Sequence, residues 1–321
     1  MRTLDPGELL GAAIAGLEPI GPGRWKFPLV PGTKSGAGVQ IEPQWATFRC
    51  AIPHASDALP FAVIRQQSTW RGGVKLVPTD NFLALRAEVP WLTQTAADCD
   101  WVSRQCREVV RGLQAATGHA VADAAPIHEE CGDTDPEMLA ERCRAGGCRA
   151  VVKDGGEVRI DIESRSVRRV IGIARHAQGL RASVALGDGQ LPGTGSENLQ
   201  AVAHFMQRAS SSLRFARAWA AGDADAPEDA GFECVFHPAS GDAPLFTAID
   251  ALTTACDLFG SEVEALISSV AVARQYLQLI EPVRAQATER MLYRRTAQAI
   301  ACRPLAASKA VLSSPTTGAT T

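Results

Sequence analysis

The sequence has few aromatic residues, no strong excess of either charge and no long apolar run. Aromatics make up 6% of the 321 residues, whereas hydrophobic residues as a whole make up 46%. Much of the apolar content is alanine, which favours helices with small-residue packing over a large all-β core. The formal net charge is −3, so no overall positive field attracts nucleic acid or an anionic membrane. No window approaches the ~18 consecutive apolar residues of a membrane span.

A regular cysteine framework is also missing. The nine cysteines are odd in number and scattered along the chain, which indicates thiols of a reducing compartment rather than a disulfide scaffold. The N-terminus, Met-Arg-Thr-Leu-Asp-Pro-Gly-Glu, has acidic residues before its apolar stretch, whereas a signal peptide starts with basic residues. We therefore expect a cytoplasmic protein with neither a membrane nor a nucleic-acid partner.

The sequence contains no motif of a known catalytic or cofactor site. None of the six histidines belongs to a metal pair such as H-E-x-x-H, and the Gly-x-Ser-x-Gly of a serine nucleophile is missing. Gly193-Thr194-Gly195-Ser196 precedes a predicted helix but lacks the lysine of a phosphate-binding loop. We interpret it as a capped helix start, and we predict no catalytic residue and no cofactor.

One group of soft ligands is a candidate metal site. His128, Cys131, Cys143 and Cys148 lie in one stretch of the chain, and zinc binds Cys and His tetrahedrally. The stretch has no Cys-x-x-Cys, and Cys143 falls within a helix predicted from Asp135. The spacing therefore favours free thiols, with a structural zinc as the alternative.

The first 120 residues predict one α+β unit. A capped helix begins at Asp5-Pro6-Gly7-Glu8, and strand-like runs follow to residue 52. Residues 59–70 fit either a short helix or a strand. The clearest feature is a hairpin between Val74–Pro78 and Phe82–Val89, whose second arm alternates apolar and polar residues as a half-buried strand does. A helix starts near Thr95 and ends before Gly118.

The same order of features restarts at Asp135-Pro136-Glu137. The strand-like stretches are 150–153, 158–162, 167–174 and 180–186. A helix is then predicted from about Ser196 to Ala220, because its apolar residues keep a 3.6-residue period.

A second hairpin is predicted from Phe232–Pro238 and Pro244–Leu252. Like the first, it joins an apolar strand that ends in proline to a mixed returning strand. The capping box Ser261-Glu262-Val263-Glu264 then predicts a closing helix, in the position of the helix from Thr95.

We therefore predict an α+β fold of two similar domains, each an antiparallel sheet packed by helices, plus a C-terminal helix. The domains span 1–120 and 135–281, with a linker at 121–134. An amphipathic helix is expected at 282–303. The remainder, 304–321, is rich in Ala, Ser and Thr and is expected to be a disordered tail.

This layout resembles that of type III secretion chaperones and of the related YbjN-type domains. Two segments carry the resemblance: the hairpin Lys75–Val89 with the helix from Thr95, and Phe232–Ala251 with the helix from Ser261. The resemblance implies domains that pair through the sheet and a helix, and that hold an extended client segment in apolar grooves. Two copies in one chain would then form an intramolecular pseudo-dimer, so that the protein is a monomer with pseudo-dimeric halves or a homodimer.

The function that we expect is non-enzymatic, chaperone-like binding of a protein client. Apolar helix faces and sheet edges need a cover, which is either the other half or a client. The candidate partner-binding residues lie on the first helix and on the two returning strands: Leu10, Ile14, Leu83, Leu85, Phe246 and Ile249. An enzyme or small-molecule-binding protein that uses the cleft between the halves is the main alternative, and a structural assembly subunit is the third.

Overall fold

A computed structural model describes residues 5–30, 36–52, 60–78, 83–118, 135–164, 167–176, 179–187, 191, 196–223, 226–237 and 241–280. Internal contacts divide the chain into residues 1–278 and 279–321, and the second unit is described only at residues 279 and 280, which are helical. The expected linker at 121–134, C-terminal helix at 282–303 and tail at 304–321 lie outside the described residues. Everything below concerns the first unit.

The first repeat contains three α-helices, one turn of 3-10 helix and six strands. In chain order these are α1 (Pro6–Ala13), β1 (Glu18–Gly21), β2 (Arg24–Pro28), β3 (Gly36–Glu42), β4 (Trp45–Ile52), α2 (Pro60–Ser68), η1 (Arg71–Gly73), β5 (Lys75–Pro78), β6 (Leu83–Pro90) and α3 (Ala96–Ala116). The strands form one antiparallel sheet, the first sheet, in the order β1-β2-β3-β4-β6-β5.

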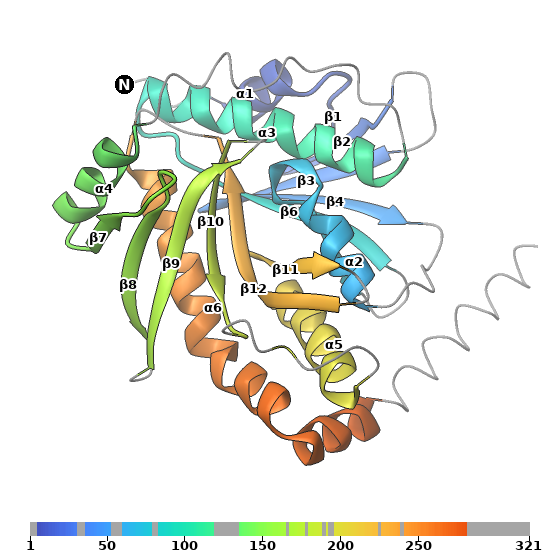
Figure 1. Cartoon of the computed structure of the whole chain (residues 1–321). Helices are drawn as coiled ribbons and strands as arrows, with labels where there is room; N and C mark the ends of the chain where they lie inside the picture. Colours follow the sequence, from blue (N-terminus) through green and yellow to red (C-terminus); the bar gives the residue numbers. More distant parts are fainter. Residues whose placement is uncertain are drawn as a thin grey trace, which may run out of the picture. The chain divides into compact units, whose positions relative to one another are not determined.

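The second repeat has the same succession of helices and strands. Its elements are α4 (Pro136–Ala145), β7 (Arg149–Val152), β8 (Val158–Ser164), β9 (Val167–His176), β10 (Gly179–Ala185), α5 (Glu197–Ser212), β11 (Arg217–Asp223), β12 (Ala226–Phe236) and α6 (Ala243–Ser268). The second sheet is also antiparallel, in the order β7-β8-β9-β10-β12-β11. Each strand thus has a counterpart in the first sheet, which confirms an α+β fold with two similar sheet domains (Figure 1).

Local sequence signals explain where several helices begin. The Thr95 side chain accepts a hydrogen bond from the Asp98 amide, and Asp98 caps the Thr95 amide in return. Ser196 accepts from the Leu199 amide at the start of α5. Such side chains satisfy amide groups that have no partner in the first helical turn. At α1 the N-cap residue Asp5 makes no such side-chain bond, although Pro6 follows it as expected.

Three expectations for the second repeat are wrong. Residues 244–252 are not a returning strand but the start of α6, and the box at Ser261 lies inside that helix. The true hairpin is β11–β12, because α5 ends at Ser212 and residues 217–223 form a strand instead of more helix. Leu245, Ile249 and Leu252 are buried at the spacing of one helix face, so helical packing of these side chains decides the outcome.

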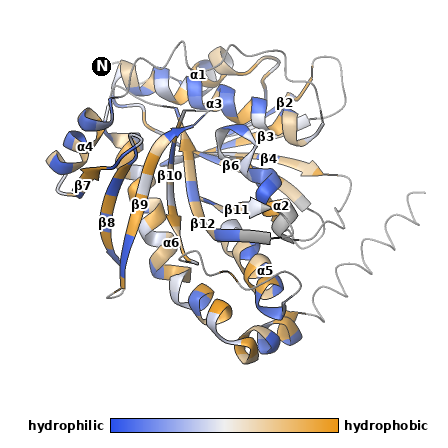
Figure 2. Ribbon diagram, in the orientation of Figure 1, coloured by the Kyte–Doolittle hydropathy of each residue, from blue (hydrophilic) through white to orange (hydrophobic). Residues whose placement is uncertain are grey.

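Each sheet is covered by helices of its own repeat on one face. α3 packs on β6 with α1 beside it, while α6 packs on β8, β10 and β12 and α4 on β7 and β8. Along β3, β8 and β9 buried residues alternate with more exposed ones, as expected when only one face is covered. Apolar and polar stretches correspondingly alternate along α3 and α6 in Figure 2. No helix among the described residues is long and apolar enough to cross a membrane.

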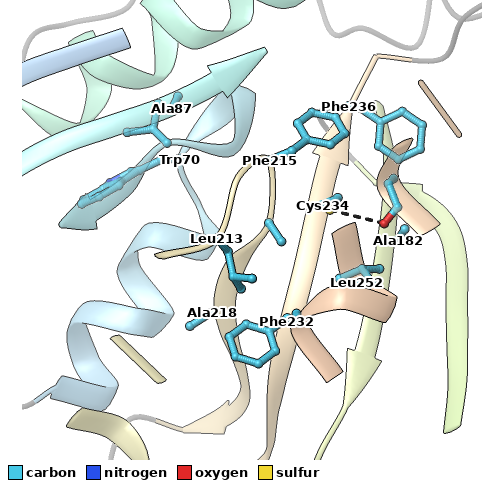
Figure 3. Packing of buried hydrophobic residues seen from close by; sticks show 14 of the residues in the cluster. Trp70, Ala87, Ala182, Leu213, Phe215, Ala218, Phe232, Cys234, Phe236 and Leu252 are labelled. Atoms are coloured by element: carbon cyan, nitrogen blue, oxygen red, sulfur yellow. Dashed lines mark hydrogen bonds between the residues drawn. The ribbon is translucent and has the colours of Figure 1, made fainter. Parts of the chain in front are cut away.

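Buried side chains of both repeats join in one hydrophobic cluster. Trp70 and Ala87 of the first repeat belong to it together with Leu213, Phe215 and Phe236 of the second (Figure 3). The rings of Phe215 and Phe236 lie 6.1 Å apart. Phe215 has a φ of 63°, so the turn that places it between the repeats is held in a conformation that a bulky residue seldom adopts.

Candidate binding surface

The two repeats contact each other through equivalent elements. α2 of the first repeat packs against β11 of the second, α5 of the second packs against β5 of the first, and α2 and α5 also meet. β5 and β11 are the inner edge strands of their sheets. Each inner edge is therefore covered by the helix that comes from the other repeat.

A buried cation stands at the first position of each inner edge strand. The Lys75 ammonium donates to the carbonyls of Leu213 and Ala216, at 2.5 and 3.0 Å, and pairs with Glu88 at 3.0 Å. Burial lowers the pKa of Lys75, and the Glu88 carboxylate opposes that change. The cation of one repeat is thus bound to the backbone turn that precedes the inner edge strand of the other.

Arg217 makes the matching contacts from the second repeat. Its guanidinium pairs with Glu233 at 2.8 Å and donates to the carbonyls of Ser68, Trp70 and Val74 at 2.8–3.1 Å. Both Lys75 and Arg217 are fully buried. Because their donors are used by carboxylates and carbonyls, these cations hold the junction together and are not available to a ligand.

Amide side chains complete the junction. Gln67 accepts from the Leu76 amide and donates to the carbonyl of Ala218, both at 3.1 Å. Ser210, its counterpart on α5, accepts from the Ala218 amide. Gln105 on α3 accepts from the His237 amide at 2.9 Å. Of these bonds, Gln67–Ala218 and Gln105–His237 join side chains of the first repeat to the backbone of the second.

The outer edge strands carry features that discourage strand addition. β1 contains Pro19 and an irregular register between Pro19 and Gly21. On β7 the carbonyl of Ala150 accepts from the Arg144 guanidinium at 3.2 Å. Proline, bulges and charged side chains are the usual means of blunting an exposed edge. The uncovered sheet faces are therefore better docking surfaces than the edges.

Three arginines on the uncovered face of the second sheet are paired with carboxylates. Arg159 pairs with Glu157 at 2.7 Å, Arg168 with Asp161, and Arg181 with Glu233 at 2.7 Å. Arg181 also lies over the Trp219 ring, 4.7 Å from its centre. The exposed Arg149 and Glu163 also lie on this face and form no ion pair with a described residue, so its unpaired charges are of opposite sign. The exposed Val151 and Val170 lie among these groups.

The uncovered face of the first sheet differs in its charge. We name it the open face; it is the side of β2, β3 and β4 that carries Arg24, Lys26, Gly36, Gly38, Gln40, Arg49 and Ala51. Arg24 and Arg49 are exposed and form no ion pair with any residue that the structure describes. Lys26 pairs with Glu18 at 2.8 Å, but both side chains are about 60% exposed, and such surface pairs are weak.

Strand register joins four cations into one line across this sheet. Lys26 is opposite Gly38, Gly38 opposite Arg49, Arg49 opposite Arg86, and Arg86 opposite Lys75. We call Lys26, Arg49, Arg86 and Lys75 the cationic row. Directly opposed residues share one face of a sheet. The inner end of the row is buried, where Lys75 and Arg86 both pair with Glu88 and Arg86 donates to the Ser211 carbonyl, whereas its outer end is open.

A strip without side chains lies on this side of β3, and one of its two residues, Gly38, is between Lys26 and Arg49. It consists of Gly36 and Gly38 on β3, and neither has a positive φ. A Cβ atom would meet only a backbone oxygen, at 3.5 Å on Gly36 and 3.6 Å on Gly38, which is ordinary contact. The fold therefore does not require glycine at these two positions.

The residues expected to bind a partner lie elsewhere. Leu10, Ile14, Leu85 and Ile249 are buried in the chain's own core, so these four are withdrawn from the candidate surface. The ring of Phe246 lies against Gly146, where a Cβ atom would collide with it. The side chain of Leu83 lies outside the described residues. The apolar periodicity of these residues therefore marks the helix and strand faces that pack in the protein's own core, and it does not mark a partner-binding surface.

The candidate zinc ligands are described only in part. Cys143 is buried and Cys148 half-buried, and the Cys148 amide donates to the Cys143 carbonyl at 2.9 Å. Burial raises the pKa of Cys143 to about 11, which keeps the thiol protonated. His128 and Cys131 lie outside the described residues. Within the described part of the chain no group of His, Cys, Asp and Glu side chains could hold a metal ion.

The sequence interpretation missed the cationic row. The pattern that could have indicated them is strand alternation, because Lys26 and Arg49 each lie on the polar side of an alternating strand. Their alignment depends on the pairing of strands that are far apart in sequence.

Comparisons with known proteins leave the chain without an assigned relative. No family model, no curated protein and no solved structure matches it.

Proposed function

We propose that this chain is a non-enzymatic, chaperone-like protein-binding module in which two repeats form an intramolecular pseudo-dimer. A segment of a client protein binds in extended form on the open face of the first sheet. The resemblance to type III secretion chaperones and YbjN-type domains leads to the same function.

One observation carries the proposal: no described helix or strand covers the open face, which carries cations that no described carboxylate neutralises. Arg49 and Arg24 are exposed there without an ionic partner among the described residues, whereas on the equivalent face of the second sheet Arg159, Arg168 and Arg181 are paired and the exposed Arg149 is offset by the exposed Glu163. A polar sheet face that no described element covers is suited to a chain in extended form, whose side chains alternate with the same period of two.

The reciprocal junction supports the pseudo-dimer. Two identical subunits related by a twofold axis contact each other through the same patch on each. Here α2 contacts β11 and α5 contacts β5, as the two halves of such an interface would. The second repeat thereby buries the inner end of the cationic row and leaves its outer end free.

Site-specific photo-crosslinking in the native host tests the function. A benzophenone amino acid replaces Ala51, which is exposed on the open face, and the matched control carries it at Ser261, which is exposed on α6. We expect one recurrent protein adduct from position 51 that is missing from position 261. No protein adduct at position 51, or the same adducts at both positions, would overturn the proposal.

A further inference from the structure

We infer that the client segment is acidic and that its carboxylates bind two arginines of the open face, Arg49 beside Gly38 and Arg24 beside Gln40. This inference rests on the proposed function and specifies the chemistry of the partner.

The cationic row has an electrostatic cost at Arg49. Arg49 lies directly opposite Arg86, and Arg86 lies directly opposite Lys75. Like charges in directly opposed positions destabilise a sheet. Glu88 compensates Lys75 and Arg86, with which it pairs, but no described carboxylate pairs with Arg49. An external carboxylate at Arg49 would relieve this repulsion.

The sheet surface beside Arg49 has space for a ligand group. Lys26 and Arg49 flank Gly38 from the two neighbouring strands, so their backbones are two strand spacings, about 10 Å, apart. Since the fold does not require glycine at this position, the missing side chain leaves room for a ligand group at the sheet surface. A carboxylate placed there would be within reach of cations on both sides, and arginine binds carboxylates with paired N–H donors.

The second repeat contains an internal version of this arrangement. Gly172 lies on β9, the strand equivalent to β3, and is directly opposite Arg159. The Glu157 carboxylate occupies the place that a Cβ on Gly172 would take, and it pairs with Arg159 at 2.7 Å. A carboxylate above a strand glycine therefore already pairs with the neighbouring arginine on the face of the second sheet. On the first sheet no described residue supplies that carboxylate.

A protein segment fits this face better than a nucleic acid. Proteins that bind single strands stack the bases on exposed aromatic rings. The one aromatic side chain among the described residues on this side of the first sheet is Trp45, which is covered by Arg214 at 5.8 Å and lies 6.3 Å from Phe215. The net charge of −3 also disfavours a polyanion as long as a nucleic acid.

Fluorescence anisotropy with the full chain tests the inference. The probe is a labelled peptide of alternating Glu and Thr, and the matched peptide has Gln in place of Glu. The proteins are the wild type, Arg49→Gln, Arg24→Gln and, as the control, Arg159→Gln on the second sheet. Circular dichroism and the melting temperature establish that each variant is folded.

We expect the wild type to bind the Glu peptide, and more tightly than the Gln peptide. Arg49→Gln should weaken binding on the order of tenfold, as loss of a charge-assisted hydrogen bond does, and Arg24→Gln should act in the same direction. Arg159→Gln should leave binding unchanged. Affinity should also fall as salt is raised from about 50 to about 300 mM.

Equal binding of both peptides, or no binding of the Glu peptide, would overturn the acidic preference. An adduct at position 51 in the crosslinking experiment would still support the proposed function in that case, so the two failures can be told apart. A labelled oligothymidine serves as the third ligand. If it binds more tightly than the Glu peptide and depends on Arg49, the partner is a nucleic acid and the inference is wrong.

Discussion

Lys75 and Arg217 make the same contact from opposite sides of the junction. Each is the first residue of an inner edge strand, pairs with a glutamate of the neighbouring strand, and donates to backbone carbonyls of the other repeat. Each repeat thus places one buried cationic side chain against the backbone of the other, and these contacts join the two similar halves into one folded unit. The predictions below begin with this exchange.

Arg217→Met should destabilise the protein by about 3–5 kcal/mol, because it leaves Ser68, Trp70 and Val74 carbonyls without donors and removes a buried ion pair from Glu233. Urea denaturation measures the change. Arg159→Gln, which removes a surface pair, should cost under about 1 kcal/mol. A free energy of unfolding for Arg217→Met within about 1 kcal/mol of the wild type would contradict the proposed role of the junction.

Gln105→Met should lower the stability of both repeats together. The change leaves the buried His237 amide without its acceptor, at a cost of about 1–3 kcal/mol. Unfolding followed by circular dichroism and by tryptophan fluorescence should shift to lower urea concentration as a single, coincident transition. Gln200→Met, at an exposed position of α5, is the control. Two separated transitions would mean that the repeats fold independently.

Stability should decrease as the pH falls below about 6.5, in part through His176. Burial lowers the pKa of His176 from its ordinary 6.5, with Arg181 and Arg217 acting in the same direction and Glu233 opposing them. Below pH 6.5 the unfolded chain binds a proton that the native state does not yet bind, so the free energy of unfolding falls by at most about 1.4 kcal/mol per pH unit from this group. Urea titrations from about pH 7.5 to pH 5 should show a smaller decrease for His176→Gln. Identical pH profiles would disprove this assignment.

Cys106 and Cys143 should resist alkylation in the native protein. Burial raises the pKa of Cys106 to about 12 and that of Cys143 to about 11, and only the thiolate reacts. Mass spectrometry after iodoacetamide treatment at about pH 8 should find both thiols unmodified, while urea exposes them. A strong chelator should change nothing. Faster alkylation of Cys143 after chelation would instead demonstrate a bound metal.

Local signals predicted much of the fold. The capped starts at Asp135 and Ser196, the box at Thr95 and the alternating strand before Pro90 depend on residues a few positions apart, and the structure has these elements there. The α+β repeat followed from their order. The prediction of a strand at 244–252 is wrong because it rests on the analogy with the first hairpin, whereas the i, i+4 and i+7 spacing of Leu245, Ile249 and Leu252 is that of a helix face.

The candidate surface depended on long-range pairing and could not be read from local patterns. Lys26, Arg49 and Arg86 are single cations in three separate strands, and only the register of the sheet aligns them. Likewise, Leu10 and Leu85 show apolar periodicity whether a face meets a client or the protein's own core. Leu10 and Leu85 are buried because α1 and the first sheet face each other with the sides that carry these residues, and this long-range packing cannot be predicted from local periodicity.

The most direct test of the account is to block the open face without disturbing the fold. Gly38→Val introduces a β-branched side chain where a Cβ meets only the Trp25 carbonyl at 3.6 Å, so stability should stay the same or rise by up to about 1 kcal/mol. In the protein that carries the photo-crosslinker at position 51, this substitution should reduce the yield of the client adduct at least about tenfold. An unchanged adduct yield from a stably folded Gly38→Val protein would show that the client does not bind on the open face.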